Sequence, residues 1–119
     1  MLNQIVMVGR IVRNPEIRET EEGKKVTDIT LAVPRTYKNA EGVYETDFLN
    51  ITLWNGIAEN TCEYCKQGDL VGVRGHIQSR TVEEKDGSKN NKMEIVADRV
   101  NFLSQAKEKE TSKDEKERE

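Results

Sequence analysis

The 119-residue sequence contains only one histidine, two cysteines and two prolines. It is therefore poor in the residues that many enzymes and disulfide-bonded proteins depend on. It has no run of about 18 apolar residues, so no membrane-spanning helix is expected. The start, MLNQIVMVGR, has neither a basic segment nor a small-residue cleavage pattern, and we interpret it as the start of a mature cytoplasmic protein without a signal peptide. Cys62 and Cys65 are expected to be free thiols in that compartment.

The scarce reactive residues do not form a catalytic or metal-binding pattern. His76 stands alone among outward-facing residues of a predicted strand, without a positioned partner. The two cysteines are spaced C-x-x-C but fall late in a predicted helix, whereas a redox motif needs the first thiol at a helix start. A zinc site needs two more ligands than the cysteines supply, and His76 is the only candidate. A phosphate-binding loop must lead into a helix, whereas Gly72 and Gly75 lie within a predicted strand. We therefore expect no enzyme, no metal and no cofactor, with the cysteines serving as small buried residues.

The formal net charge is −3, which counts against a nucleic-acid binder because such domains are usually basic. The distribution of charge sets the local field, however, and net charge alone does not decide the partner. Acidic residues gather in two loop-like stretches, around 16–22 and 83–86, while several arginines fall inside strand-like stretches. A locally basic surface is therefore compatible with this composition.

The apolar pattern predicts five strands and one helix. Alternation and turn residues place strands at 2–13, 25–33, 46–54, 69–82 and 91–103, with Pro34 ending the second. Hairpin tips are expected at 39–42 and 85–88. A helical stripe that includes Ala58, Cys62 and Cys65 predicts a helix over about 57–66, with Asn55 as its N-cap and Gly68 just beyond its end.

This order of elements predicts an all-β fold with one helix. Five strands with a helix between the third and fourth match the OB-fold, a five-stranded Greek-key barrel that binds oligonucleotides in many proteins. We expect residues 1–104 to form this domain. The segment 105–119 is dense in charge and has almost no apolar residue, and it is expected to be a disordered tail. A fold of this kind does not by itself establish a function.

The stretch TDFLNITLW, residues 46–54, has two unlike faces. Leu49, Ile51 and Leu53 form an ordinary core face, since side chains alternate along a strand. The opposite face carries Phe48 and Trp54 at its ends, with polar residues between them. These two rings either cover a hydrophobic satellite or an oligomer interface, or they form a platform on which bases stack.

Polar and basic residues near these rings favour the stacking hypothesis. Asn50 and Thr52 can form hydrogen bonds with sugars or base edges, and the nearby cations can contact phosphates. Tyr37 and Tyr44 flank the predicted hairpin tip between 25–33 and 46–54. The candidate cations are Arg35 and Lys38 beside Tyr37, and Arg74 and Arg80 on the outer face of 69–82.

The sequence from about Leu2 to Leu103 strongly resembles bacterial single-stranded DNA-binding proteins. The resemblance rests on NQIVMVGRIVRNPEIR, VTDITLAVPRTYKN, TDFLNITLW and AENTCEYCKQGDLVGVRGHIQSR. It implies an OB-fold, usually assembled as a homotetramer around which single-stranded DNA wraps. By position, it implies base stacking on Tyr37, Phe48 and Trp54 and phosphate contacts from Arg10, Arg74 and Arg80.

Two departures from that family bear on partners and binding mode. Val82 occupies a position where many members have an aromatic residue, which implies one stacking platform fewer. The chain also lacks the linker and acidic Pro-Phe tip through which typical members recruit replication and repair proteins. It therefore resembles the short, tail-less, competence-associated paralogues of Gram-positive bacteria, and recruitment through a tip is expected to be absent. An OB-fold kept for protein contacts is an alternative of a different class, and an enzyme using the paired cysteines is a third.

Overall fold

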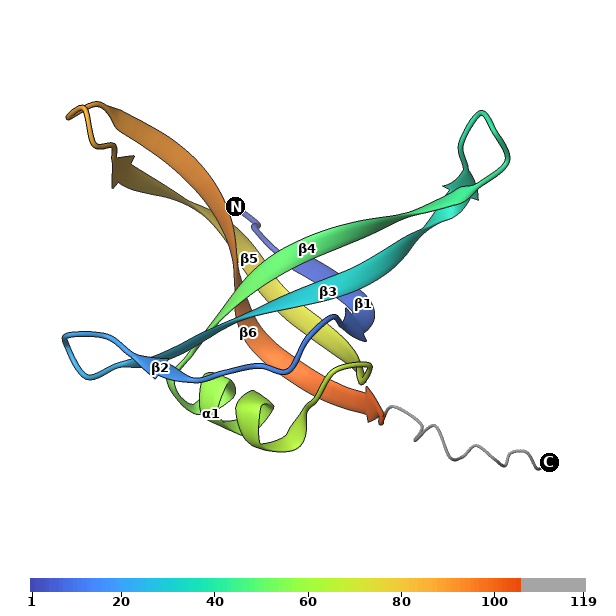
Figure 1. The fold of residues 1–119 in the computed structure, drawn as a ribbon, viewed down its shortest axis with the longest axis horizontal. Coiled ribbons are helices and arrows are strands. Elements are labelled where there is room, and N and C mark those ends of the chain that lie inside the picture. The colour runs from blue at the N-terminus through green and yellow to red at the C-terminus, as the bar shows by residue number, and fades with distance from the viewer. Residues whose placement is uncertain (106–119) are drawn as a thin grey trace.

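The computed structural model describes residues 1–105 and consists mainly of strands, with one helix (Figure 1). The predicted tail, apart from Gln105, lies outside the described residues. The elements in chain order are β1 (Ile5–Ile11), β2 (Arg18–Glu19), β3 (Lys25–Lys38), β4 (Tyr44–Trp54), α1 (Asn55–Tyr64), β5 (Leu70–Glu83) and β6 (Lys89–Ser104). All five predicted strands and the helix are present. Within the described chain, no helix has the length and apolar character needed to cross a membrane.

The short strand β2 falls in the acidic stretch that was predicted to be a loop. Arg18 pairs with Val26 and Glu19 with Lys25, and Gly23 closes the turn with a φ of 85°. An ion pair of 3.0 Å between Lys25 and Glu19 also joins the two strands. Because β2 adds one strand to the count, the helix lies between β4 and β5 and not between the third and fourth strands, as the sequence suggested.

The predicted end of one strand and both predicted ends of the helix were wrong. Pro34 does not end its strand, since β3 continues to Lys38 through a register irregularity that accommodates a residue without an N–H donor. The helix starts at Asn55, with Trp54 as a cap residue that forms no side-chain capping bond. At the other end, Cys65 is the C-cap, and its N–H donates to the Thr61 carbonyl. Packing and backbone irregularity determine these ends, and neither is visible in hydrophobic periodicity.

The strands close into a barrel. The sheet order is β1-β5-β6-β4-β3-β2, and an additional pairing of β1 with β3 at Arg10↔Ala32 and Ile11↔Leu31 completes the ring. The parallel contact between β4 and β6 has two residue pairs, Ile51↔Ile95 and Thr52↔Val96. This closed, five-stranded ring with one helix confirms the predicted OB-fold.

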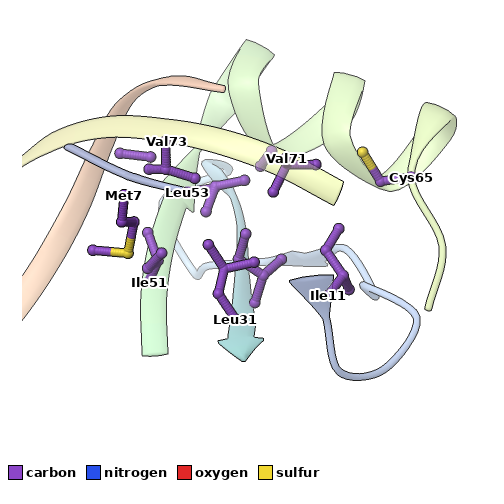
Figure 2. Packing of buried hydrophobic residues seen from close by; sticks show 11 residues of the cluster. Met7, Ile11, Leu31, Ile51, Leu53, Cys65, Val71 and Val73 are labelled. Atoms are coloured by element: carbon purple, nitrogen blue, oxygen red, sulfur yellow. The ribbon is translucent and has the colours of Figure 1, made fainter. Parts of the chain in front are cut away.

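The core of the barrel comes from alternate residues of the strands and one face of α1. Figure 2 shows these side chains converging from β1, β3, β4 and β5, with Cys65 at the helix end. The largest fully buried apolar side chains are Ile11, Ile29, Leu31, Ile51, Leu53, Val71 and Val73. Gly9 permits the closure, because a Cβ there would lie 2.8 Å from the Ala32 carbonyl oxygen. This confirms the close backbone approach that a glycine inside a strand predicted.

Two long hairpins project from the barrel (Figure 1). One joins β3 to β4, and its turn is closed by the Asn39 N–H bonded to the Val43 carbonyl. The other joins β5 to β6, and the Glu84 N–H bonds to the Ser88 carbonyl. Gly42 and Gly87 have positive φ angles, 80° and 88°, at these turns. Both hairpin tips lie where the sequence predicted them.

Candidate nucleic-acid interface

The outer face of β4 carries the two aromatic residues singled out from the sequence. The Phe48 side chain is 63% exposed and that of Trp54 is 37% exposed, while Ile51 and Leu53 behind them are fully buried. The predicted two-faced strand is therefore confirmed. Trp54 follows Phe48 by six positions of extended chain, a distance of about 20 Å along the strand. The face between them is long enough to accommodate several nucleotides.

A row of paired residues leads from Phe48 across the sheet to a cation. Phe48 pairs with Ala32 of β3, and Ala32 pairs with Arg10 of β1. Arg10 is exposed and donates from Nη1 to the Gly68 carbonyl at 3.0 Å. Within residues 1–105 no carboxylate lies within ion-pair distance of its guanidinium. The structure thus places an unneutralised cation two strands from Phe48, separated from it by a small side chain.

The polar centre of this face is already hydrogen-bonded. Asn50 accepts from the Thr30 hydroxyl at 2.7 Å, and Thr52 donates to Asp28 at 3.1 Å. The Asp28 carboxylate also forms a 3.1 Å ion pair with Arg18. Among the described residues the side-chain nitrogen of Asn50 has no hydrogen-bond partner, so it can donate to a ligand.

Sequence reasoning missed the residues of β3 and its neighbours that support this centre. Asp28, Thr30 and Ala32 share the outer face of β3, and Arg13 donates to the Thr30 hydroxyl at 3.2 Å. The alternation in 25–33 could have identified the β3 residues, because they occupy the positions between the predicted core residues. Their bonds to Asn50, Thr52 and Arg18 depend on strand register, which was not predicted.

The β3–β4 hairpin presents two more rings. Tyr37 is 63% exposed, and Tyr44 is also exposed. The Lys38 ammonium lies 5.6 Å from the centroid of the Tyr44 ring, a cation–π contact. The hairpin therefore carries an accessible aromatic surface and a cation at the positions that the sequence indicated.

Arg35 is not free to act as an unpaired cation. Its guanidinium binds both oxygens of Asp47, at 3.2 and 3.0 Å, and a Glu45 oxygen at 2.8 Å. The hydrogen bond to Asp47 and the charge of that carboxylate, with smaller contributions from Tyr37 and Glu45, raise the pKa of Arg35. The same hydrogen bond lowers the pKa of Asp47. One positive and two negative charges meet here, which makes the cluster slightly acidic.

Arg74 and Arg80 lie on β5, a strand that carries none of the proposed stacking residues. Within the described chain, β5 pairs with β1 and β6 and not with β3 or β4. Arg74 is exposed opposite Val6 and Arg99, and Arg80 lies opposite Lys92 on the β5–β6 hairpin. In the sheet order one strand, β6, lies between β5 and β4, so the structure places these arginines beyond β6 from the outer face of β4. Their contact with phosphates stays a prediction.

The comparisons with known proteins bear directly on this face. A model of the Single-strand binding protein family matches residues 2–103. The chain belongs to this family. It is 47% identical over 103 residues to Single-stranded DNA-binding protein B of Bacillus subtilis (strain 168), covering 87% of this chain and 91% of that protein. It is 43% identical over 114 residues to Single-stranded DNA-binding protein of Staphylococcus aureus (strain MRSA252), a match that covers 96% of this chain and 73% of that protein.

Membership of the single-strand binding protein family confirms the resemblance inferred from the sequence. Proteins of this family are not enzymes, in agreement with the expectation for this chain. Cys65 fits that conclusion, because burial raises its pKa to about 11, which disfavours a reactive thiolate. Cys62, also predicted to be buried, is only partly buried. In the part of the chain that the structure describes, no cluster of histidine, cysteine or carboxylate side chains could hold a metal ion.

The sole histidine bridges β5 and β6. Its Nδ1 lies 3.1 Å from an Asp98 oxygen and its Nε2 lies 3.0 Å from the Gln78 side-chain oxygen. The Gln78 amide nitrogen donates to Glu94, which leaves its oxygen to face His76 as an acceptor. Both ring nitrogens thus face acceptors, which favours the doubly protonated imidazolium. The bond to Asp98, and then that to Gln78, raises the pKa of His76.

Replacing Asp98 with asparagine is expected to lower the pKa of His76. Because the folded-state pKa is raised, these bonds stabilise the fold fully below the unfolded value and are lost as pH rises through the folded value. Asp98→Asn should therefore reduce the pH dependence of unfolding above about pH 6.5. NMR titration of the single imidazole measures the shift directly. Glu94→Gln should change the pKa of His76 less, because Glu94 reaches the imidazole only through its hydrogen bond to Gln78. An unchanged pKa of His76 in Asp98→Asn would contradict the role assigned to Asp98.

Proposed function

We propose that this protein binds single-stranded DNA without sequence specificity, by stacking bases on Tyr37, Phe48 and Trp54. The observation that carries this proposal is the outer face of β4, where two aromatic side chains remain exposed at the ends of a polar strip. The names of the relatives, which describe single-stranded DNA-binding proteins, support the same ligand. We infer roles in DNA replication, recombination, repair or DNA uptake, in the cytoplasm and associated with the nucleoid.

The energetics of stacking fit a binder without base specificity. Every base has a flat face, and each base stacked on an aromatic ring contributes about 1–3 kcal/mol. The chain as a whole is acidic, so stacking has to provide much of the affinity. Double-stranded DNA should bind far more weakly, because its bases are already stacked on one another.

The basic residues of the proposal fall into two groups. Lys38 lies on β3 next to Tyr37, and Arg10 lies on β1, which pairs with β3. We assign both residues phosphate contacts near the stacked bases. Arg74 and Arg80 lie on β5, which β6 separates from β4, and we assign them phosphate contacts with DNA that continues from the outer face of β4 onto the β5–β6 hairpin. Asn50 and Thr52 are proposed to face sugars or base edges.

We also propose that the protein assembles as a homotetramer. Val6 and Val8 of β1 and Leu103 of β6 are exposed on one face, where Leu103 packs beside Gly72. The edge of β1 that faces away from β5 pairs with β3 only at Arg10 and Ile11, so residues 5–9 leave backbone groups available to a second copy. Light scattering at micromolar concentration tests this assembly, and a monomer would contradict it.

Fluorescence titration with oligo-dT tests the binding function. Trp54 is the only tryptophan, so its emission reports directly on the outer face of β4. We expect strong quenching by oligo-dT and little by a duplex of equal length. The slope of log K against log salt should be moderate, since each phosphate contact contributes about −0.7. Absence of quenching and of any mobility shift at low salt would contradict single-strand binding and would favour a barrel used for protein contacts.

A further inference from the structure

The Arg35 cluster on the β3–β4 hairpin lies where the regular ladder between the two strands fails. Pro34 pairs with Thr46 and Lys38 with Tyr44, so the three residues 35–37 of β3 face Glu45 alone. A bulge of this kind bends the strand and reorients its side chains. Tyr37 is part of the bulge, and ladder pairing therefore does not fix its direction.

The ion pairs of Arg35 bridge this irregular segment. Three guanidinium nitrogens bind two carboxylates of β4, Asp47 on one side of the bulge and Glu45 opposite it. The second oxygen of Glu45 accepts from the Asn39 amide at 3.4 Å, and the Asn39 oxygen accepts from the backbone of Val43 at 3.0 Å. A connected set of bonds thus runs from Asp47 to the hairpin tip and involves residues on both sides of Tyr37 in the sequence, Arg35 and Asn39.

The cluster lies on the reverse side of the strand from the proposed stacking face. Asp47 pairs with Val33 and has the same parity as the core-facing Leu49, whereas Phe48 faces outward. Side chains two residues apart lie on the same face, so Asp47 and the guanidinium bound to it face away from Phe48. A phosphate beside a base stacked on Phe48 is therefore not placed to bind Arg35.

The two carboxylates also make the cluster a poor phosphate site. The guanidinium charge is compensated by Asp47 in a two-pronged bond, the strongest geometry for this pair, and further by Glu45. A phosphate would have to displace one of these carboxylates or approach a site with an excess of negative charge. Electrostatic repulsion makes both routes unfavourable.

We propose that Arg35 and Asp47 are positioning residues that fix the β3–β4 hairpin so that Tyr37 can stack a base. This inference rests on the proposed function and replaces the phosphate contact that the sequence suggested for Arg35. The pair acts through Tyr37 and does not itself touch the DNA. Loss of either partner should leave Tyr37 exposed but poorly oriented.

Asp47→Asn tests the proposal through the sign of its effect. Removing a negative charge near a polyanion site ordinarily strengthens DNA binding, whereas loss of the brace should weaken oligo-dT binding by about 3- to 10-fold, part of the contribution of one stacked base. Glu41→Gln is the matched control. It removes the same charge from the tip of the same hairpin, where the side chain has no hydrogen bond or ion pair within residues 1–105, and should leave affinity unchanged or slightly higher.

Substitutions of Arg35 separate positioning from phosphate contact. Arg35→Lys keeps the charge but loses the two-pronged geometry, so it should bind oligo-dT as weakly as Arg35→Gln. Both should keep the wild-type slope of log K against log salt, whereas loss of a phosphate contact would reduce its magnitude by about 0.7. The double variant Arg35→Gln/Asp47→Asn should be no weaker than either single variant, because the two residues act as one unit.

The outcomes distinguish this inference from the proposed function. If the unmodified chain does not bind oligo-dT, the proposed function fails and the inference with it. If the chain binds and Phe48→Ala weakens binding, but Asp47→Asn binds as well as or better than wild type, the positioning role alone is wrong. Equal thermal unfolding midpoints for all variants exclude global unfolding as the cause of weaker binding.

Discussion

Replacing Phe48 and Trp54 together with alanine is expected to lower the affinity for oligo-dT by about 2–6 kcal/mol, since each ring that stacks a base contributes about 1–3 kcal/mol. Both rings lie on the outer face of β4, and Phe48 is the more exposed of the two. Removing the tryptophan also removes the intrinsic fluorescence, so anisotropy of a labelled oligonucleotide is the appropriate measurement. Phe48→Ala alone retains Trp54 and should give about half of the total loss.

Tyr64→Ala provides the matched control for this experiment. Tyr64 is 60% exposed, nearly as exposed as Phe48. It lies on α1, however, and its ring contacts that of Phe102 of β6. Because Tyr64 does not lie on the β4 face, its loss should leave the affinity for oligo-dT unchanged. Equal losses for Tyr64→Ala and Phe48→Ala would show that general surface hydrophobicity, and not the β4 face, determines binding.

Gly75→Ala is expected to lower the free energy of unfolding by about 2–4 kcal/mol, from the middle of the typical range of overpacking costs to somewhat above it. A Cβ at this position would overlap the Val96 carbonyl oxygen and also lie 3.1 Å from the Ala97 Cα. These are backbone atoms, and the register of β5 and β6 shifts at this point, so neither strand can move without disturbing the bulge. Urea denaturation measures the change.

Gly72→Ala is the matched control on the same strand. Its Cβ would meet the Leu103 side chain at 3.5 Å, an ordinary contact with a flexible group. The substitution should therefore change the free energy of unfolding by less than about 1 kcal/mol, and reduced chain entropy in the unfolded state could make it slightly favourable. Similar costs for Gly72→Ala and Gly75→Ala would contradict the assignment of a backbone clash to Gly75.

The parts of the fold predicted correctly from the sequence are those that depend on side-chain alternation. Leu49, Ile51 and Leu53 occupy the inner face of β4 because a strand must separate its faces, and the same rule places Phe48 and Trp54 outside. The barrel follows from the number and order of elements, which turn residues mark clearly. These features are local, so a single sequence contains them.

The features that sequence reasoning missed depend on contacts between distant residues. Whether Arg35 faces a phosphate or Asp47 depends on the bulge after Pro34, and a bulge changes register without altering hydrophobic alternation. Arg74 lies on a strand separated from that of Phe48 by β6, an order of strands that periodicity does not specify. The ion pairs of the site and the order of its strands can thus be known only from the tertiary structure, whereas its aromatic residues could be predicted from the sequence.

The β5–β6 hairpin has a consequence for chain continuity. Its ladder runs from Leu70↔Ser104 to Glu83↔Lys89, and the turn beyond it buries no side chain. A protease that cuts between residues 85 and 88 would therefore divide the polypeptide without opening the barrel, because the ladder and core would hold the two fragments together. The turn is accordingly a site where a label or an inserted peptide could be added while the folded barrel is retained.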